Sequence, residues 1–223
     1  MAIRIFVVDD HPILREGMER LIDREPDMEV CGQSDGESIS GVFETEPDVV
    51  ILDLSLKSSN GLDLIHTIKA QLPKTAVFVL SMHDENLYAE RVLRAGAAGY
   101  IMKQEAPGKV LDAIRKVANG NVYVSDAMSK RLLKGLVKPT KETPIASLSD
   151  REFQVFQYIG EGYTHQEIAN HLSLSKKTIE SHVERIKEKL SLKNGRELLR
   201  RAVEWVIRSQ GPAAGTNQGR MQM

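Results

Sequence analysis

Five residues of the first half of the chain could do chemistry together. Each carries an oxygen or ammonium group and stands at or directly after the end of an apolar run. They are Asp9, Asp10, Asp53, Ser81 and Lys103. Carboxylates held close together repel one another unless a cation neutralises them, and Mg²⁺ prefers carboxylate, water and phosphate oxygens as ligands. An aspartate beside such an ion can attack a phosphoryl donor and form an acyl phosphate. A hydroxyl and an ammonium group would then bind the new phosphoryl oxygens.

The elements that must position these residues alternate between β-like and amphipathic helical patterns. The expected strands are 3–8, 29–34, 49–52, 76–81 and 99–102, and the expected helices are 13–24, 37–44, 62–71, 87–95 and 109–119. This alternation predicts an α/β fold, a doubly wound, flavodoxin-like five-stranded parallel sheet. Ligands of such sheets bind beyond the carboxyl ends of the strands, which is where the five residues fall.

The acidic constellation resembles the receiver domain of bacterial two-component response regulators, over residues 1–120. The resemblance implies that Asp53 accepts a phosphoryl group from a sensor histidine kinase. It also implies a Mg²⁺ cofactor, bound by Asp9, Asp10, Asp53 and the backbone carbonyl of Ser55.

The same resemblance assigns three more residues. Ser81 and Tyr100 match the paired switch residues, and Lys103 matches the phosphate-binding lysine. A rival class is the phosphohydrolases with an aspartate nucleophile, which need a second aspartate two residues later, where this chain has Ser55. We therefore expect a switch and no turnover enzyme, with self-phosphorylation and autodephosphorylation at Asp53 only.

The rest of the chain has a different texture. We expect residues 121–147 to form a linker with a short helix near 126–136, and residues 210–223 to form a disordered tail. Residues 148–209 have a purely helical pattern, with capping boxes that begin at Ser149 and Thr164. A smaller all-α domain with a helix-turn-helix is the expectation for this part.

This helical part resembles a LuxR/FixJ-type DNA-binding domain. The resemblance is carried by Leu148-Ser149-x-Arg151-Glu152, Thr164-x-x-Glu167-Ile168-Ala169 and Ser175-x-Lys177-Thr178-Ile179-x-x-His182-x-x-x-Ile186-x-x-Lys189-Leu190. It implies that the helix at 175–190 enters the major groove of double-stranded DNA. The expected DNA-binding residues are Lys176, Lys177, Arg185 and Lys189 at phosphates, Ser181 and Glu184 at base edges, and Thr178. His182 lies toward the packed face and is expected to be mainly structural.

The last expected helix, which ends near Ser209, places Leu198, Leu199, Ala202, Val203 and Val206 along one stripe, with Trp205 beside it. Most of this stripe is expected to be core. The resemblance implies that part of it is a homodimer surface on DNA, with half-sites about one helical turn apart.

Charge and cysteine content fit this division. Residues 1–120 carry 13 basic and 20 acidic residues, whereas residues 121–223 carry 17 and 11. An acidic half joined to a basic half indicates a polyanionic partner for the latter. No apolar stretch approaches the ~20 residues of a membrane span. With Cys31 as its one cysteine, the chain is expected in the reducing cytoplasm.

Two alternatives remain open at this point. The first is a DNA-binding regulator whose receiver works without phosphorylation. The second is a signalling module whose helical domain contacts proteins rather than DNA.

Overall fold

The computed structural model describes residues 2–56, 59–137, 144–172 and 174–209. The chain divides into two compact units, Met1–Lys141 and Glu142–Met223. The boundary between the units falls inside the stretch predicted as a linker, whose helix belongs to the first unit. Parts of that linker and the tail at 210–223 lie outside the described residues, so the predicted tail stays a prediction.

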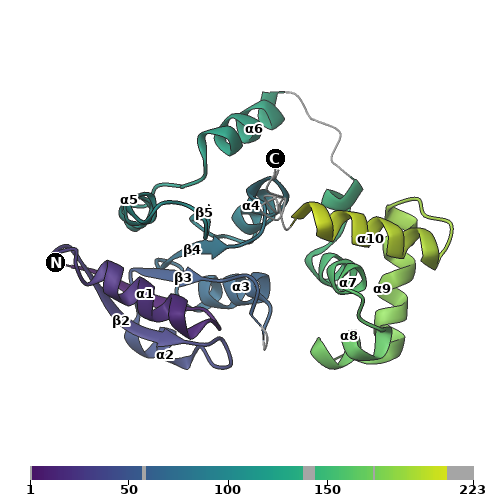
Figure 1. Ribbon diagram of the computed structural model, residues 1–223, viewed down its shortest axis with the longest axis horizontal. Coiled ribbons are helices and arrows are strands. Elements are labelled where there is room, and N and C mark those ends of the chain that lie inside the picture. Colours follow the sequence, from purple (N-terminus) through teal and green to yellow (C-terminus); the bar gives the residue numbers. More distant parts are fainter. Residues whose placement is uncertain (1, 57–58, 138–143, 173, 210–223) are drawn as a thin grey trace, which may run out of the picture. The chain divides into compact units, whose positions relative to one another are not determined.

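The first unit is a five-stranded parallel sheet in the order β2-β1-β3-β4-β5, with helices on both faces (Figure 1). Its strands are β1 (Ile3–Val8), β2 (Met28–Ser34), β3 (Val49–Leu52), β4 (Ala76–Ser81) and β5 (Gly99–Met102). Its helices are α1 (Pro12–Ile22), α2 (Ser40–Thr45), α3 (Gly61–Gln71), α4 (Glu85–Arg94), α5 (Pro107–Ala118) and α6 (Asp126–Val137). The predicted fold class is confirmed.

Strand polarity in this sheet explains the position of the polar residues. All four residues of β3 are buried, as expected for a strand covered on both faces. On one face, Ile5 and Ile51 pack with Met18 of α1 and Ile114 of α5 in a continuous apolar core. Because β1, β3 and β4 run parallel, the residues that follow them meet at one edge of the sheet.

Local hydrogen bonds set several helix starts that differ from the expected ones. Helix α4 begins two residues early because the Asp84 carboxylate accepts the backbone N–H of Asn86 at 2.8 Å. Helix α2 begins three residues late. The turn before it is held by Glu37 N–H donating to Asp35 at 3.0 Å and by Ser40 N–H donating to Ser38 at 3.3 Å.

The chain returns to the sheet after α5. The backbone N–H of Tyr123 donates to the Ala98 carbonyl at 3.0 Å, and the N–H of Tyr100 donates to the Tyr123 carbonyl at 2.8 Å. A side chain at Gly99 would place its Cβ 2.6 Å from the Tyr123 carbonyl oxygen, so only glycine allows this approach. The residues predicted as linker therefore pair with the free side of β5 before α6 begins.

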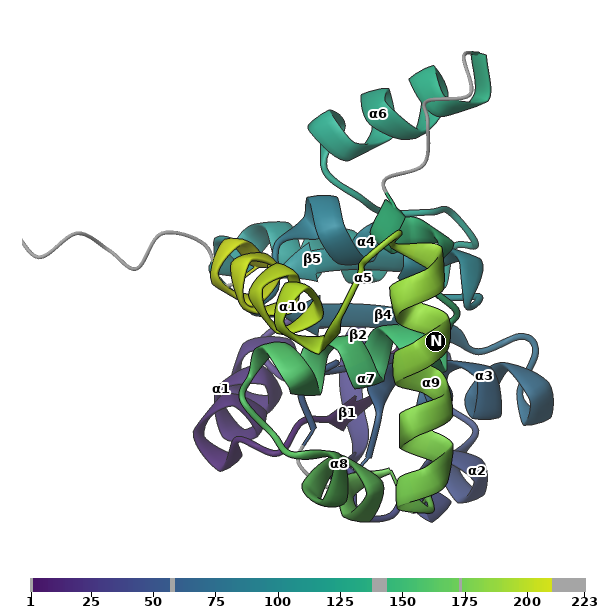
Figure 2. The same ribbon diagram turned by 90° about the vertical axis from the view of Figure 1, so that its right-hand side faces the viewer.

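The second unit contains η1 (Pro144–Ser147), α7 (Asp150–Gly160), α8 (His165–His171), α9 (Lys176–Lys189) and α10 (Gly195–Ser209). Both predicted capping boxes are present, Ser149 with Glu152 and Thr164 with Glu167. Figure 2 shows α9 as one continuous helix with α8 beside its first turns. Among the described helices of the whole chain, none is long and apolar enough to cross a membrane.

Candidate functional site

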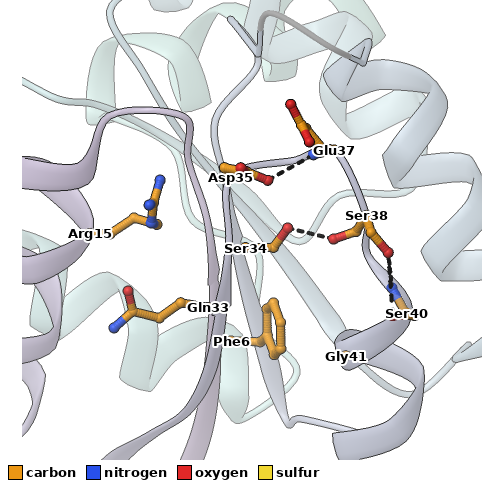
Figure 3. A pocket seen from close by; sticks show the side chains of 9 residues that line it. All are labelled: Phe6, Arg15, Gln33, Ser34, Asp35, Glu37, Ser38, Ser40 and Gly41. Atoms are coloured by element: carbon orange, nitrogen blue, oxygen red, sulfur yellow. Dashed lines mark hydrogen bonds between the residues drawn. The ribbon is translucent and has the colours of Figure 1, made fainter.

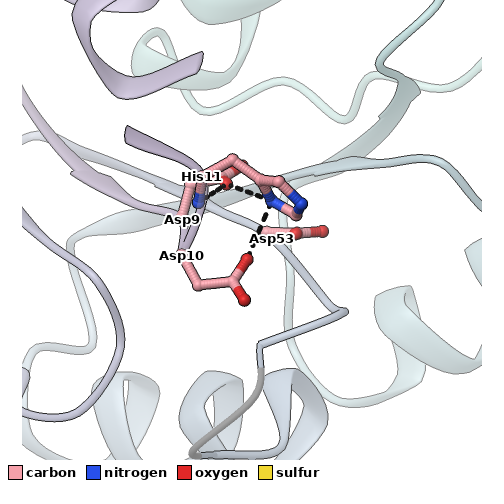
Figure 4. A group of neighbouring side chains, drawn as sticks. All are labelled: Asp9, Asp10, His11 and Asp53. Atoms are coloured by element: carbon pink, nitrogen blue, oxygen red, sulfur yellow. Dashed lines mark hydrogen bonds and ion pairs between the residues drawn. The ribbon is translucent and has the colours of Figure 1, made fainter. Parts of the chain in front are cut away.

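Three aspartates and a histidine meet beyond the ends of β1 and β3 (Figure 4). Each of Asp9, Asp10, His11 and Asp53 offers one ligand atom, and these atoms lie within 4.8 Å of one another. Asp9 is 2% and Asp53 is 1% exposed. Buried carboxylates at this spacing need a compensating positive charge.

Lys103, which follows β5, provides such a charge. Its Nζ atom lies 2.7 Å from Oδ2 of Asp9 and 2.9 Å from Oδ2 of Asp53. The backbone N–H of Lys103 donates to the Ser81 carbonyl at 2.8 Å, which ties the end of β5 to the end of β4. Burial opposes the ammonium charge, but Asp53 and Asp9 outweigh it and raise the pKa of Lys103. For Asp53, burial raises the pKa, and the nearby Lys103 ammonium offsets part of this rise.

His11 is a member of the cluster that the sequence prediction missed. Its Nδ1 atom lies 3.1 Å from Asp9 and 2.8 Å from Asp10, and its backbone N–H donates to Asp9 at 2.8 Å. The sequence did carry a signal for His11. This residue stands between two aspartates and Pro12, the first residue of α1, and the strand-to-helix turn at this place points it back over the strand end.

The predicted switch residues are both buried at the edge of this cluster. Ser81 and Tyr100 are each 0% exposed. Burial raises the pKa of the Tyr100 phenol, which therefore stays a hydrogen-bond donor. Its hydroxyl donates to the backbone carbonyl of His83 at 2.7 Å.

His83 is a second residue that the sequence prediction missed. Its backbone N–H donates to Ser81 Oγ at 3.2 Å, and its ring Nε2 lies 3.0 Å from Ser55 Oγ. The ring stacks on Tyr88 of α4 at 4.4 Å between centroids. Burial, with a smaller effect of Lys103, lowers the pKa of His83 to about 4. His83 thus joins three predicted site residues, Ser55, Ser81 and Tyr100.

The loop after Asp53 folds back on it. The backbone N–H of Ser55 donates to Oδ1 of Asp53 at 3.2 Å. The metal contact predicted for the Ser55 carbonyl stays a prediction, as do the roles predicted for the other residues of the cluster.

A separate polar pocket lies between the start of α1 and the β2–α2 turn (Figure 3). Its hydroxyl groups serve the turn itself, since Ser34 donates to the Ser38 carbonyl and Ser38 lies 3.3 Å from Ser40. Arg15 at its margin donates to the backbone carbonyl of Asp9. The side chains that line the pocket thus hold the β2–α2 turn and the backbone of Asp9, beside the carboxylate cluster.

In the second unit, α9 presents one polar and one apolar face. Ser175 caps the helix by accepting the Thr178 N–H at 3.1 Å, and its hydroxyl lies 2.8 Å from that of Thr178. Ile179, Val183 and Ile186 are buried. All the predicted DNA contacts except the half-buried Thr178 are exposed. The exposed residues of α9 are Lys176, Lys177, Glu180, Ser181, Glu184, Arg185, Glu188 and Lys189.

Two of the predicted DNA contacts already have partners within the domain. Lys189 Nζ lies 2.7 Å from Glu152 of α7, whose side chain is 4% exposed. Burial opposes the Glu152 charge, but Lys189 and Ser149 hold its pKa below the usual range. Glu184 lies 2.8 Å from Lys187, one turn along α9. The DNA contacts of Lys189 and Glu184 stay predictions.

Helix α10 divides its apolar residues between core and surface. Leu198, Ala202 and Trp205 are buried, and Trp205 packs edge-on against Phe153 of α7 with ring centroids 5.0 Å apart. Leu199, expected in the same stripe, is instead 47% exposed, and Ile207 is 66% exposed. An exposed apolar stripe therefore runs beside the core stripe.

His182 is half-buried on α9, and burial, with a smaller effect of Arg185, lowers its pKa. Its ring Nδ1 atom is buried, and the structural role expected for His182 stays a prediction.

Comparisons with known proteins match both units. Residues 5–115 match the response regulator receiver domain, and residues 146–202 match the bacterial regulatory proteins of the LuxR family. The chain is 35% identical over 210 residues to the oxygen regulatory protein NreC of Staphylococcus carnosus, covering 90% of this chain and 97% of that protein. It is 34% identical over 204 residues to the response regulator UvrY of Escherichia coli K12, covering 90% and 94%.

Solved structures also match the chain across both units. The RcsB response regulator of Salmonella typhimurium superposes with a TM-score of 0.71 at 27% identity, covering 91% of this chain and 98% of that one. A structure of an RcsB–DNA complex gives 0.68 at 27% identity, covering 90% and 98%. The chain therefore belongs to the two-component response regulators, with a receiver domain followed by a LuxR-type helix-turn-helix DNA-binding domain.

Proposed function

We propose that this response regulator is switched by phosphorylation of Asp53 and that the switch controls its binding to double-stranded DNA. The observation that carries the proposal is the buried Lys103 ammonium, which bridges Asp9 and Asp53 beside the Ser81 hydroxyl. This arrangement provides a nucleophile together with the groups that bind a phosphoryl oxygen. The donor is a phosphohistidine of a sensor histidine kinase.

The donor set of the cluster fits Mg²⁺. Its carboxylates are hard oxygen ligands, and the side chain of Asp10, 8% exposed, is buried like those of Asp9 and Asp53. Asp9, Asp10, Asp53 and the Ser55 carbonyl would hold the ion. When bound, Mg²⁺ neutralises the carboxylates and the oxygens of the incoming phosphoryl group.

The protein's own residues perform the transfer. A carboxylate oxygen of Asp53 attacks phosphorus, the bond from phosphorus to the donor histidine breaks, and an acyl phosphate forms. Lys103 moves its ammonium onto a phosphoryl oxygen, and Ser81 donates its hydroxyl to another. Attack of water on phosphorus later returns Asp53 and inorganic phosphate, so the protein is a switch and performs no other turnover.

The DNA-binding half acts through α9 in the major groove. Lys176, Lys177 and Arg185 contact phosphates, while Thr178, Ser181 and Glu184 lie toward base edges. Lys189 is paired with Glu152, and we assign it mainly to holding α9 on α7 beside the DNA.

A second copy of the chain completes the DNA reader. Leu199, Val203 and Ile207 follow one another at four-residue spacing on α10, and the two outer residues are exposed. We propose that this stripe forms a symmetric homodimer when the protein is active. We also propose a cytoplasmic location, which the proposed DNA partner and the single cysteine support.

The test of phosphorylation is an intact-mass measurement after incubation with acetyl phosphate and Mg²⁺. We expect one phosphoryl adduct on the wild type, none on Asp53→Asn, and a wild-type result for Asp112→Asn, whose side chain is 73% exposed. An adduct that persists in Asp53→Asn would overturn the assignment. Equal affinity for DNA with and without the adduct would favour a phosphorylation-independent receiver.

A further inference from the structure

Helix α6 is attached to the receiver through its first two turns, and the rest of the helix extends away from the sheet (Figures 1 and 2). Both carboxylate oxygens of Glu85 are engaged there. Oε1 accepts the backbone N–H of Ser125 at 2.7 Å, and Oε2 accepts the Ser125 hydroxyl. Because hydrogen bonds with a charged partner are about twice as strong as neutral ones, this contact is a strong polar attachment of the segment that begins α6.

Further contacts surround this attachment. The Ser125 hydroxyl accepts the N–H of Met128 at 3.1 Å and so caps α6. Arg131 donates to the backbone carbonyl of Asn86 at 2.7 Å, and the Met128 side chain is fully buried. The first two turns of α6 thus rest on the first turn of α4. We call the pair Glu85–Ser125 the latch.

The latch lies close to the predicted switch residue Ser81, because Glu85 follows Ser81 by four positions in the chain. Ser81 accepts the His83 N–H at 3.2 Å, and Glu85 is the first residue of α4. On the sheet side, the residues just before Ser125 are held by Tyr123, whose carbonyl accepts the Tyr100 N–H at 2.8 Å. Both predicted switch residues, Ser81 and Tyr100, are therefore connected by short paths to the two sides of the latch.

We propose that the latch is a phosphorylation-sensitive attachment that controls the helix leading to the DNA-binding domain. This inference rests on the proposed phosphorylation of Asp53. When the Ser81 hydroxyl turns toward a phosphoryl oxygen, the backbone from Ser81 to Glu85 shifts with it. Hydrogen bonds weaken steeply as distance and angle depart from their optimum, so the latch opens and α6 is released from α4.

Because α6 packs on α4, it belongs to the first compact unit and not to the second. A helix held at one end by charge-assisted hydrogen bonds has two arrangements, latched and free, that differ by a few contacts. Phosphorylation adds about −1.5 to −2 charges at one site, and the latch converts this local event into freedom of the chain that carries the DNA reader.

Hydrogen exchange of the full-length protein tests the proposal, with peptides from residues 122–137 as the readout. We expect phosphorylation by acetyl phosphate and Mg²⁺ to speed exchange in the first turns of α6 about tenfold, the factor that loss of one charge-assisted hydrogen bond permits. Glu85→Gln should give the same acceleration without the donor. Ser125→Ala is a second variant. It removes the hydroxyl that both joins Glu85 and caps α6, so it should also accelerate exchange in the first turn of α6 without the donor.

The matched control is Glu90→Gln, which removes a carboxylate of α4 that pairs with Arg94 on the same helix. It should exchange like the wild type. A phosphoryl adduct confirmed by mass, with unchanged exchange in α6, would overturn the latch and leave phosphorylation standing. Wild-type exchange in Glu85→Gln would also overturn it. If Asp53 takes no adduct at all, the proposed function fails first and the coupling fails with it.

Discussion

At the scale of single residues, the receiver site depends on polar groups that are buried but satisfied. Lys103 places one positive charge between two carboxylates, and its short ion pairs to Asp9 and Asp53 reduce the repulsion between them. His83 is held as a neutral ring between Ser55 and Tyr88. Each residue is positioned by contacts with an element distant in the chain, so each is sensitive to protonation or truncation.

The buried ring of His83 predicts a pH dependence of stability. Its pKa is lowered from 6.5 to about 4 in the folded protein, so the unfolded chain binds more protons between these values. The free energy of unfolding should therefore fall as the pH drops from about 7 toward 4. In His83→Gln, the free energy of unfolding should fall less over the same pH range. Urea unfolding of the first unit, monitored by circular dichroism, measures this difference.

The control for this experiment is His66→Gln, which changes an exposed histidine of α3 and should retain the wild-type slope. Equal slopes for His83→Gln and the wild type would contradict the buried neutral ring.

At the scale of elements, α9 is oriented by what lies beneath it. Three apolar residues bury one face, and the Lys189–Glu152 ion pair joins its last turn to the first turn of α7. Removing one partner of a pair with a buried charge leaves the other charge without compensation, which costs more than the pair itself contributes.

Lys189→Met should accordingly lower the free energy of unfolding of the second unit by about 2 kcal/mol. Trp205 is the one tryptophan of the chain and packs against Phe153, so its fluorescence reports on this unit alone during urea unfolding. Lys193→Met, at an exposed lysine, should leave the midpoint unchanged. The double variant Glu152→Gln with Lys189→Met should recover part of the loss; no recovery would contradict a charge origin.

The elements of the first unit could be predicted because their signals are local. Apolar runs mark β3 and β4, and the residues that end them identify the carboxylate cluster. The roles of His83 and Glu85 could not be predicted, because their hydrogen bonds join residues 28 and 40 positions apart. The pairing of Lys189 with Glu152 spans 37 positions, and a helical wheel of α9 alone shows that lysine only as a polar residue available to DNA.

At the scale of the whole molecule, the two units divide their charge. Residues 1–120 carry an excess of seven acidic residues, whereas residues 121–223 carry an excess of six basic ones. The basic excess is modest for a DNA-binding protein, so one recognition helix has limited electrostatic attraction for the duplex. We therefore expect tight binding to depend on two copies that engage two half-sites together.

A substitution in the exposed stripe of α10 tests whether tight DNA binding depends on two copies of the chain. Ile207→Glu places a charge in the proposed dimer surface, because Ile207 is 66% exposed. Affinity for DNA with two half-sites should fall at least tenfold, while binding to one isolated half-site stays within about twofold. Gel-shift titrations of both duplexes measure this. Ile13→Glu, the same substitution at an 88% exposed position of α1, is the control, and equal losses on both duplexes would argue against dimerisation through α10.

The pairing of Tyr123 with β5 also bears on solubility. Strand β5 lies at one border of the sheet, and a border strand with unpaired backbone groups is a template for aggregation. Tyr123 occupies the Ala98 carbonyl and the Tyr100 N–H that would otherwise face outward. The stretch between α5 and α6 thus shields the sheet from pairing with other chains, and a receiver fragment that ends at residue 120 would lose this protection.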